Sequence, residues 1–131
     1  MNRLVLDTTA YSRFQRGHVE AVARIDSAVF VGMPSVTLGE LETGFRLGHR
    51  YDANREILEE FLRNVVVELI PVDDHVAQIY GEIVVALRRS GRPLPTNDIW
   101  IAACAASVGA TVLTFDAHFA QIERVGALIL A

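Results

Sequence analysis

Short apolar runs alternate along the chain with longer stretches in which apolar residues recur at helical spacing. Apolar runs bounded by turn residues predict buried strands, and three- and four-residue spacing predicts helices with one buried face. We predict strands at 3–6, 29–34, 66–71, 111–114 and, as a last short strand, 128–130. We predict helices at 8–16, 18–27 and 52–65, from Thr37 to near Gly48, from Asp73 or Asp74 to near Leu87, from Thr96 to near Val108, and after Asp116. This alternation is typical of an α/β fold with a parallel sheet between helices, and we expect one domain over residues 1–131.

Acidic residues stand at several of the predicted strand ends and helix starts. Asp7 ends the first strand, and Glu40 lies in the first helical turn after the second. Asp98 falls in the first turn of its helix, and Asp116 follows the fourth strand. Ligands of open α/β sheets bind outside the carboxyl ends of the strands, which share one edge of a parallel sheet. We therefore expect these four side chains to converge.

Helix capping is the competing explanation for the same acids. Carboxylates in a first turn accept hydrogen bonds from free backbone N–H groups and complement the helix dipole. Thr37 is predicted to be the N-cap of its helix, and Thr37-x-x-Glu40 matches a capping box. Each acid taken singly is explained by capping, so the metal-site hypothesis depends on the whole set.

Mutual repulsion favours a bound cation if the acids do converge. Two unit charges 4 Å apart repel by about 4 kcal/mol at an effective dielectric constant of 20. All-oxygen ligation suits Mg²⁺ or Mn²⁺, and such an ion can activate water for attack on a phosphodiester. The one cysteine, Cys104, leaves no cysteine-based zinc site. The histidines at 18, 49, 75 and 118 are scattered, and each is expected to be a surface or capping residue.

Composition limits the partners and the location of the protein. The net charge of −4 gives no overall basic footprint for nucleic acid, although all 12 basic residues are arginine. Small groups at Arg13/Arg16, Arg46/Arg50 and Arg88/Arg89/Arg92 could bind phosphate, or they could be solvated helix ends. Hydrophobic residues form 51% of the chain, which hints at an oligomer or partner interface. No apolar run is long enough to span a membrane and no signal peptide is evident, so we expect a cytoplasmic protein.

Each of the four acids lies in a short motif, and the motifs follow one another along the chain as Leu4-Val5-Leu6-Asp7-Thr8-Thr9, Thr37-Leu38-Gly39-Glu40-Leu41, Pro95-Thr96-Asn97-Asp98-Ile99-Trp100-Ile101-Ala102-Ala103 and Val112-Leu113-Thr114-Phe115-Asp116. In this order they resemble the motifs of the PIN-domain family, and in particular those of the VapC toxins of bacterial toxin–antitoxin modules. The resemblance covers essentially the whole chain. It implies a three-layer α/β/α sandwich with a five-stranded parallel sheet.

The same resemblance implies an Mg²⁺- or Mn²⁺-dependent endoribonuclease that works as a toxin. The catalytic and metal-binding acids map to Asp7, Glu40, Asp98 and Asp116, with Asp7 and Asp98 as the main ligands. Polar positions that flank the family's site map to Thr8, Asn97 and Thr114. The implied partners are an RNA substrate, a second copy in a homodimer, and a small antitoxin whose tail occupies the acidic groove.

The chain departs from the family pattern at two positions, and other functions remain as alternatives. Many relatives carry another acid at the position of His118, and a polar residue at that of Phe115. One alternative is a metal-dependent phosphatase or DNA nuclease, although a phosphatase with an Asp nucleophile would need an acid where Thr9 stands. The other is a non-catalytic PIN-like binding module in which the acids are only caps.

Overall fold

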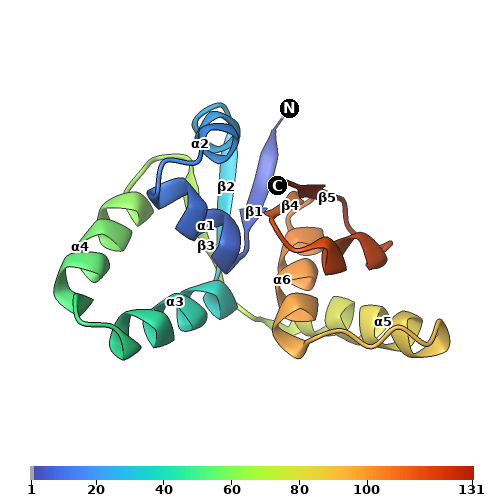
Figure 1. Cartoon of the computed structure of the whole chain (residues 1–131). Coiled ribbons are helices and arrows are strands. Elements are labelled where there is room, and N and C mark those ends of the chain that lie inside the picture. The colour runs from blue at the N-terminus through green and yellow to red at the C-terminus, as the bar shows by residue number, and fades with distance from the viewer. Residues whose placement is uncertain (1) are drawn as a thin grey trace.

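The computed structural model describes residues 2–131, which form a parallel sheet with helices on both faces (Figure 1). The sheet has the strand order β3-β2-β1-β4-β5, and each neighbouring pair is parallel. The strands are β1 (Arg3–Leu6), β2 (Phe30–Pro34), β3 (Val67–Ile70), β4 (Thr111–Thr114) and β5 (Ala127–Ile129). The predicted three-layer α/β/α sandwich with five parallel strands is confirmed.

Helices connect the strands and follow the predicted order. They are α1 (Thr8–Gln15), α2 (Val19–Asp26), α3 (Ser35–Leu47), α4 (Tyr51–Leu62), α5 (Asp74–Arg89), α6 (Thr96–Ser107) and the 3₁₀ helix η1 (Ala117–Gln121). Asp73 is the N-cap of α5, because its carboxylate accepts the Val76 N–H at 2.9 Å. Gly17 closes α1 with a φ of 81°, a conformation that glycine adopts without steric cost. Within residues 2–131, none of the helices has the length and apolar character that crossing a bilayer requires.

Alternating side chains of the strands send the apolar residues into two separate cores. Leu4, Leu6 and Met33 pack with α1, α2, α3 and α4 on one face of the sheet. Val5 and Val112 pack with α5 and α6 on the other face. Figure 1 shows these two groups of helices on opposite sides of the sheet. Because both faces are covered, the strand sequences are almost continuously apolar, as expected for a parallel sheet.

The order of the strands reverses at β1. The chain runs from β1 outward through β2 to β3, and then returns to place β4 on the other side of β1. Such a reversal opens a crevice at the carboxyl ends of the two central strands, where α/β proteins bind ligands. Asp7 follows β1 and Asp116 follows β4, so both lie at this reversal.

The predicted capping role of Thr37 is wrong. Helix α3 begins two residues earlier, at Ser35, because Pro34 ends β2 and stands at the N-cap position. Thr37 is therefore inside the helix and fully buried, and its hydroxyl donates to the carbonyl of Leu6 at 3.0 Å. Glu40 lies beyond the first turn of α3 and forms no capping box. Helix capping therefore does not explain why an acid stands at position 40.

The predicted end of the fourth helix is also wrong. Helix α4 stops at Leu62, and Arg63 caps it, so Val65 lies in the turn before β3. Val65 belongs to the predicted apolar stripe but is 97% exposed. The short strand β3 must align with β2, with Val67 opposite Val31, and the chain therefore leaves the helix early.

Candidate metal centre

Asp7 is held rigidly where β1 passes into α1. It is the N-cap of α1, and its Oδ1 accepts the Ala10 N–H at 2.9 Å and the Thr9 hydroxyl at 2.7 Å. Its Oδ2 accepts the hydroxyl of Thr114. The side chain is only 4% exposed, and this burial raises the pKa of Asp7, with a smaller upward effect from Asp116. Asp7 is both a cap and a buried carboxylate that faces another acid.

Asp98 lies in the first turn of α6, as predicted, and its charge is strongly disfavoured. Its pKa is raised from 3.8 to about 6, first by burial and then by the negative charges of Asp116, Glu40 and Asp7, in that order. His118 acts in the opposite direction. The side chains of all four predicted acids therefore lie close enough to interact electrostatically at one edge of the sheet.

Glu40 projects from α3 toward the same edge and is held by two of the predicted polar residues. The hydroxyl of Thr8 donates to its Oε1 at 2.7 Å, and the side-chain amide of Asn97 donates to its Oε2 at 3.3 Å. Thr8 begins α1 and Asn97 precedes Asp98 in α6. Glu40 thus joins three helices that are far apart in sequence, and these contacts orient its carboxylate.

Asp116 and His118 complete the cluster from the turn after β4. Asp116 is the N-cap of η1, and its Oδ1 accepts the His118 N–H at 2.9 Å. The same oxygen lies 3.2 Å from Nδ1 of His118. Possible ligand atoms of Asp98, Asp116 and His118 all lie within 4.8 Å of one another. Within residues 2–131 this is the one such group of three or more possible ligands, and neither Asp7 nor Glu40 belongs to it.

Thr114 connects the acids of the two central strands. It is fully buried at the end of β4, donates to Asp7, and accepts the backbone N–H of Asp116 at 2.9 Å. Each of the three flanking positions predicted from the sequence, Thr8, Asn97 and Thr114, therefore contacts a predicted acid or its backbone.

The donor chemistry of this edge fits a hard divalent cation. Carboxylate oxygens are the ligands that Mg²⁺ and Mn²⁺ prefer, and an imidazole nitrogen is compatible with Mn²⁺. Convergent carboxylates are costly without a positive charge between them, as the raised pKa of Asp98 indicates. Capping alone would not require Glu40, Asp98 and Asp116 to face one another.

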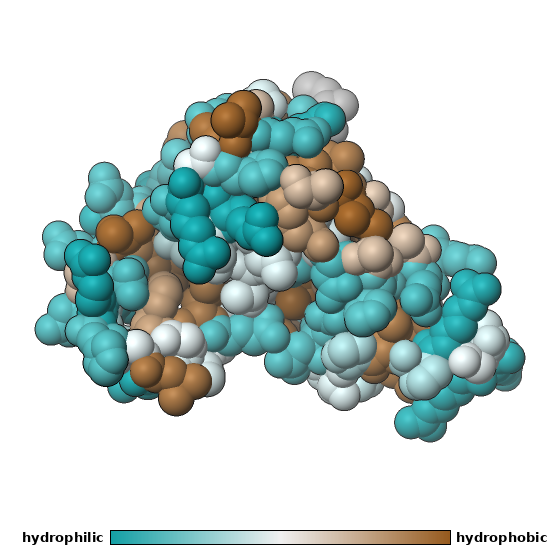
Figure 2. All heavy atoms as spheres, viewed as in Figure 1, coloured by the Kyte–Doolittle hydropathy of each residue, from teal (hydrophilic) through white to brown (hydrophobic). Residues whose placement is uncertain are grey.

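His118 is the residue that the sequence interpretation missed. Its position was treated as the loss of an acidic neighbour, yet its ring lies beside Asp98 and Asp116. The spacing Asp116-x-His118 immediately after a strand was the available signal, because residues 116 and 118 share the turn that opens η1. The space-filling view shows an indentation between the ends of α3 and α6, bordered mainly by hydrophilic side chains (Figure 2).

Comparisons with known proteins agree with this fold. The PIN domain family model matches residues 4–125. Ribonuclease VapC5 of Mycobacterium tuberculosis is 33% identical, and the alignment covers 91% of this chain and 87% of the relative. The solved structure of VapBC-5 from M. tuberculosis, a member of the VapBC family of toxin–antitoxin systems, is 32% identical with a TM-score of 0.76, covering 99% and 100% of the two chains.

A more distant structure supports the fold alone. VapBC2 from Rickettsia felis, solved bound to a promoter DNA fragment, has a TM-score of 0.85 at 21% identity and covers 98% of each chain. The family match over almost the whole length, together with the VapC relatives, shows that this chain belongs to the PIN-domain family and is a member of the VapC type.

Proposed function

We propose that this protein is a divalent-metal-dependent endoribonuclease that acts in the cytoplasm as the toxin of a toxin–antitoxin pair. The observation that carries the proposal is the convergence of Asp7, Glu40, Asp98 and Asp116, whose charges add to burial in raising the pKa of Asp98 to about 6. The relative named ribonuclease VapC5 supports RNA as the substrate. The acids alone would be compatible with other phosphodiester substrates.

Asp7, Glu40, Asp98 and Asp116 would hold Mg²⁺ or Mn²⁺, with Asp7 and Asp98 as the main ligands and His118 as an additional neighbour. When bound, such an ion supplies an activated water and neutralises charge on the phosphodiester. Thr114 keeps the carboxylate of Asp7 in one orientation by hydrogen bonding. Thr8 and Asn97 do the same for Glu40, so the acids are oriented before substrate binds.

A small antitoxin is the proposed inhibitor, with its tail in the acidic groove. The VapBC structures among the neighbours support a partner of this kind. Figure 2 shows a second hollow with an apolar floor between α1 and the α3–α4 hairpin. Phe14, Phe45 and Phe61 are half-buried on the core of this face of the sheet and leave apolar surface for a partner segment.

A homodimer is the proposed oligomeric state. Large hydrophobic side chains remain at the surface of the single chain: Val19, Val29, Leu47, Ile57, Val65, Leu69, Val72, Val85 and Ile129. Single exposed apolar residues are ordinary, so the number of them, rather than any one, supports an interface. Light scattering of the purified protein with and without its antitoxin tests this state.

An RNA cleavage assay with and without Mg²⁺ tests the catalytic proposal. We expect wild-type protein to cut RNA with Mg²⁺ and to stop when the metal is chelated. Asp7→Asn should lose cleavage and saturable Mn²⁺ binding while retaining a cooperative unfolding transition. Asp74→Asn is the matched control, because Asp74 is an exposed first-turn acid of α5 and should cut normally.

The same experiment separates the alternatives. An Asp7→Asn protein that cuts RNA at the wild-type rate contradicts the assignment. A non-catalytic module whose acids are only caps would show no saturable Mn²⁺ site and little thermal stabilisation by the metal. Cleavage of DNA or of a phosphate monoester, but not of RNA, would indicate the nuclease or phosphatase alternative. Relief of toxicity by co-expression of the product of a neighbouring short gene tests the toxin role.

A further inference from the structure

We propose that Arg13, Arg16 and Phe115 form a subsite that binds one nucleotide of single-stranded RNA beside the acidic cluster. This inference rests on the proposed ribonuclease function and names the residues that would grip the substrate. It starts from a contact that the metal centre does not use.

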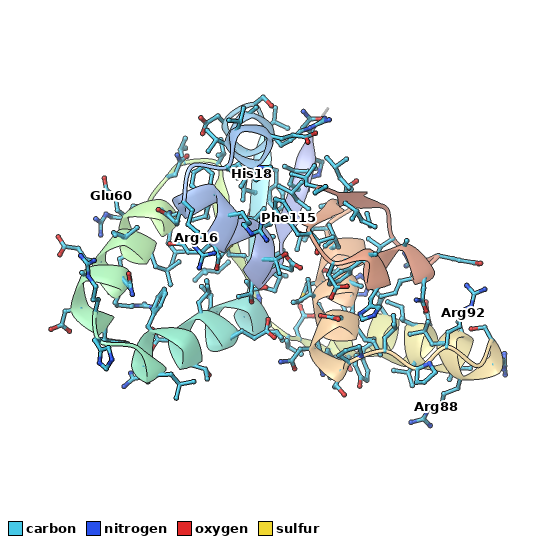
Figure 3. The ribbon with its side chains drawn as sticks, in the orientation of Figure 1. Arg16, His18, Glu60, Arg88, Arg92 and Phe115 are labelled. Atoms are coloured by element: carbon cyan, nitrogen blue, oxygen red, sulfur yellow. The ribbon has the colours of Figure 1, made fainter. Side chains whose placement is uncertain are left out.

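Three segments meet around the ring of Phe115. The guanidinium carbon of Arg13, in the last turn of α1, lies 4.8 Å from the centroid of the ring. The imidazole of His18, from the loop between α1 and α2, meets the ring edge-on with centroids 4.8 Å apart. Figure 3 shows Arg16, His18 and Phe115 around α1 in the middle of the molecule.

His18 and Thr9 hold this group in place. Nδ1 of His18 accepts the Ala21 N–H at 3.2 Å as the N-cap of α2, and Nε2 lies 3.2 Å from the carbonyl oxygen of Ala131. The backbone N–H of Phe115 donates to the hydroxyl of Thr9 at 3.0 Å, and that hydroxyl donates to Asp7. The backbone of Phe115 is therefore linked to the carboxylate of Asp7 through the hydroxyl of Thr9. Phe115 is also followed directly by Asp116 in the chain.

The charges of the arginines are available to a ligand. Arg13 and Arg16 are exposed, and among residues 2–131 neither has a carboxylate within ion-pairing distance. The protein carries a net charge of −4 and an acidic cluster that repels phosphate. Arg13, over the ring that precedes Asp116, and Arg16, at the C-cap of α1, supply local positive charge of the kind that RNA binding requires. Arg88 and Arg92 lie far from it, at the end of α5 (Figure 3).

The geometry favours a base stacked on Arg13 and a phosphate bound by Arg16. The Arg13 guanidinium lies over the ring of Phe115 and Arg13 is exposed, so we place the base against the side of the guanidinium that faces away from the ring. Single-stranded RNA is commonly recognised by stacking of unpaired bases on aromatic rings and guanidinium planes. Arginine also binds phosphate oxygens through paired N–H groups. A double-stranded region could not offer a base face to this position.

Binding and cleavage of a fluorescent single-stranded RNA of about ten nucleotides test the subsite. Anisotropy in EDTA reports affinity, and cleavage with Mg²⁺ reports KM and kcat. We expect Arg13→Gln and Phe115→Leu each to raise Kd and KM about fivefold and to leave kcat within about twofold. Arg16→Gln should lower the slope of log affinity against log salt by about one.

Matched variants separate a subsite from a general charge or folding effect. Arg88→Gln removes an arginine from the last turn of another helix and should change neither Kd nor KM. Phe115→Tyr keeps the ring and should bind like wild type, which Phe115→Leu should not. Wild-type affinity in Arg13→Gln, or equal loss in Arg13→Gln and Arg88→Gln, would overturn the inference while leaving the ribonuclease function intact. If wild-type protein neither binds nor cleaves RNA, both proposals fail together.

Discussion

Thr114 donates its hydroxyl hydrogen to Oδ2 of Asp7, although the two residues are 107 positions apart in the chain. The same hydroxyl accepts the backbone N–H of Asp116 at 2.9 Å. One small buried side chain therefore sets the relative positions of the acids that follow β1 and β4. It does so without adding charge, since a hydroxyl can donate and accept at once.

Thr114→Val should destabilise the protein by about 2 kcal/mol, because it removes a hydrogen bond to a buried carboxylate without changing the side-chain shape. Urea unfolding near neutral pH measures the loss. Thr111→Val, at the start of β4, is the control, since among residues 2–131 its hydroxyl has no hydrogen-bond partner and it should change stability little. Equal stability of the Thr114→Val and Thr111→Val proteins would contradict this role.

Asp98→Asn should raise the thermal stability of the metal-free protein above pH 6. A carboxyl whose pKa rises from 3.8 unfolded to about 6 folded costs stability once it is ionised in both states. That cost is fully present above about pH 6 and fades as the pH falls from 6 toward 3.8. The melting temperature of Asp98→Asn should therefore exceed that of wild type at about pH 7.5, and the difference should shrink at about pH 4.5.

At about pH 7.5, added Mn²⁺ should make the melting temperature of wild type higher than that of Asp98→Asn. In the proposed metal centre Mn²⁺ should bind the ionised form of Asp98 and stabilise wild type, while the asparagine variant should gain little. Asp74→Asn serves as the control for removing an exposed first-turn acid and should show neither effect. An Asp98→Asn protein that melts below wild type at both pH values would be evidence against the proposed repulsion.

Gly32→Ala should destabilise the fold, because a methyl group at this position of β2 would have to displace the side chains of Ile70 and Val5. An added Cβ would lie 2.4 Å from Cδ1 of Ile70 and 2.9 Å from Cγ2 of Val5. Overpacking of this kind costs about 1–3 kcal/mol. Gly81→Ala, on α5 with open space around it, should instead stabilise by about 0.5–1 kcal/mol. Guanidinium unfolding should therefore give a lower free energy of unfolding for Gly32→Ala and a higher one for Gly81→Ala than for wild type.

Thr37→Val should cost about 1 kcal/mol, because it removes a buried hydrogen bond from α3 to the carbonyl of Leu6 at 3.0 Å. Thr43→Val in the same helix is the control, since the hydroxyl of Thr43 only bonds back to Gly39 and is exposed. If Thr37 were an N-cap, its replacement would reduce helix content at the start of α3, which amide hydrogen exchange would detect.

Local sequence determined most of the secondary structure and the positions of the acids along it. An apolar run such as Leu4-Val5-Leu6 presents apolar side chains on both sides of the strand and so indicates a strand buried on both faces. Asp73 caps α5 through a hydrogen bond from a backbone N–H only three residues away. These patterns act within a few residues of the chain. The sequence also placed Asp7, Asp98 and Asp116 at strand ends or helix starts before any contact was known.

Only the tertiary structure decided which of those residues meet. Thr37 matched a capping box by spacing, but the packing of α3 against β1 buries it and gives its hydroxyl to Leu6. Asp116 faces Asp7 because β4 lies next to β1, a pairing that no local pattern encodes. Repulsion among the acids likewise arises from distances across the sheet. The order of the strands, which depends on the burial of both faces of the sheet, brings acids from separate elements together in one candidate metal centre.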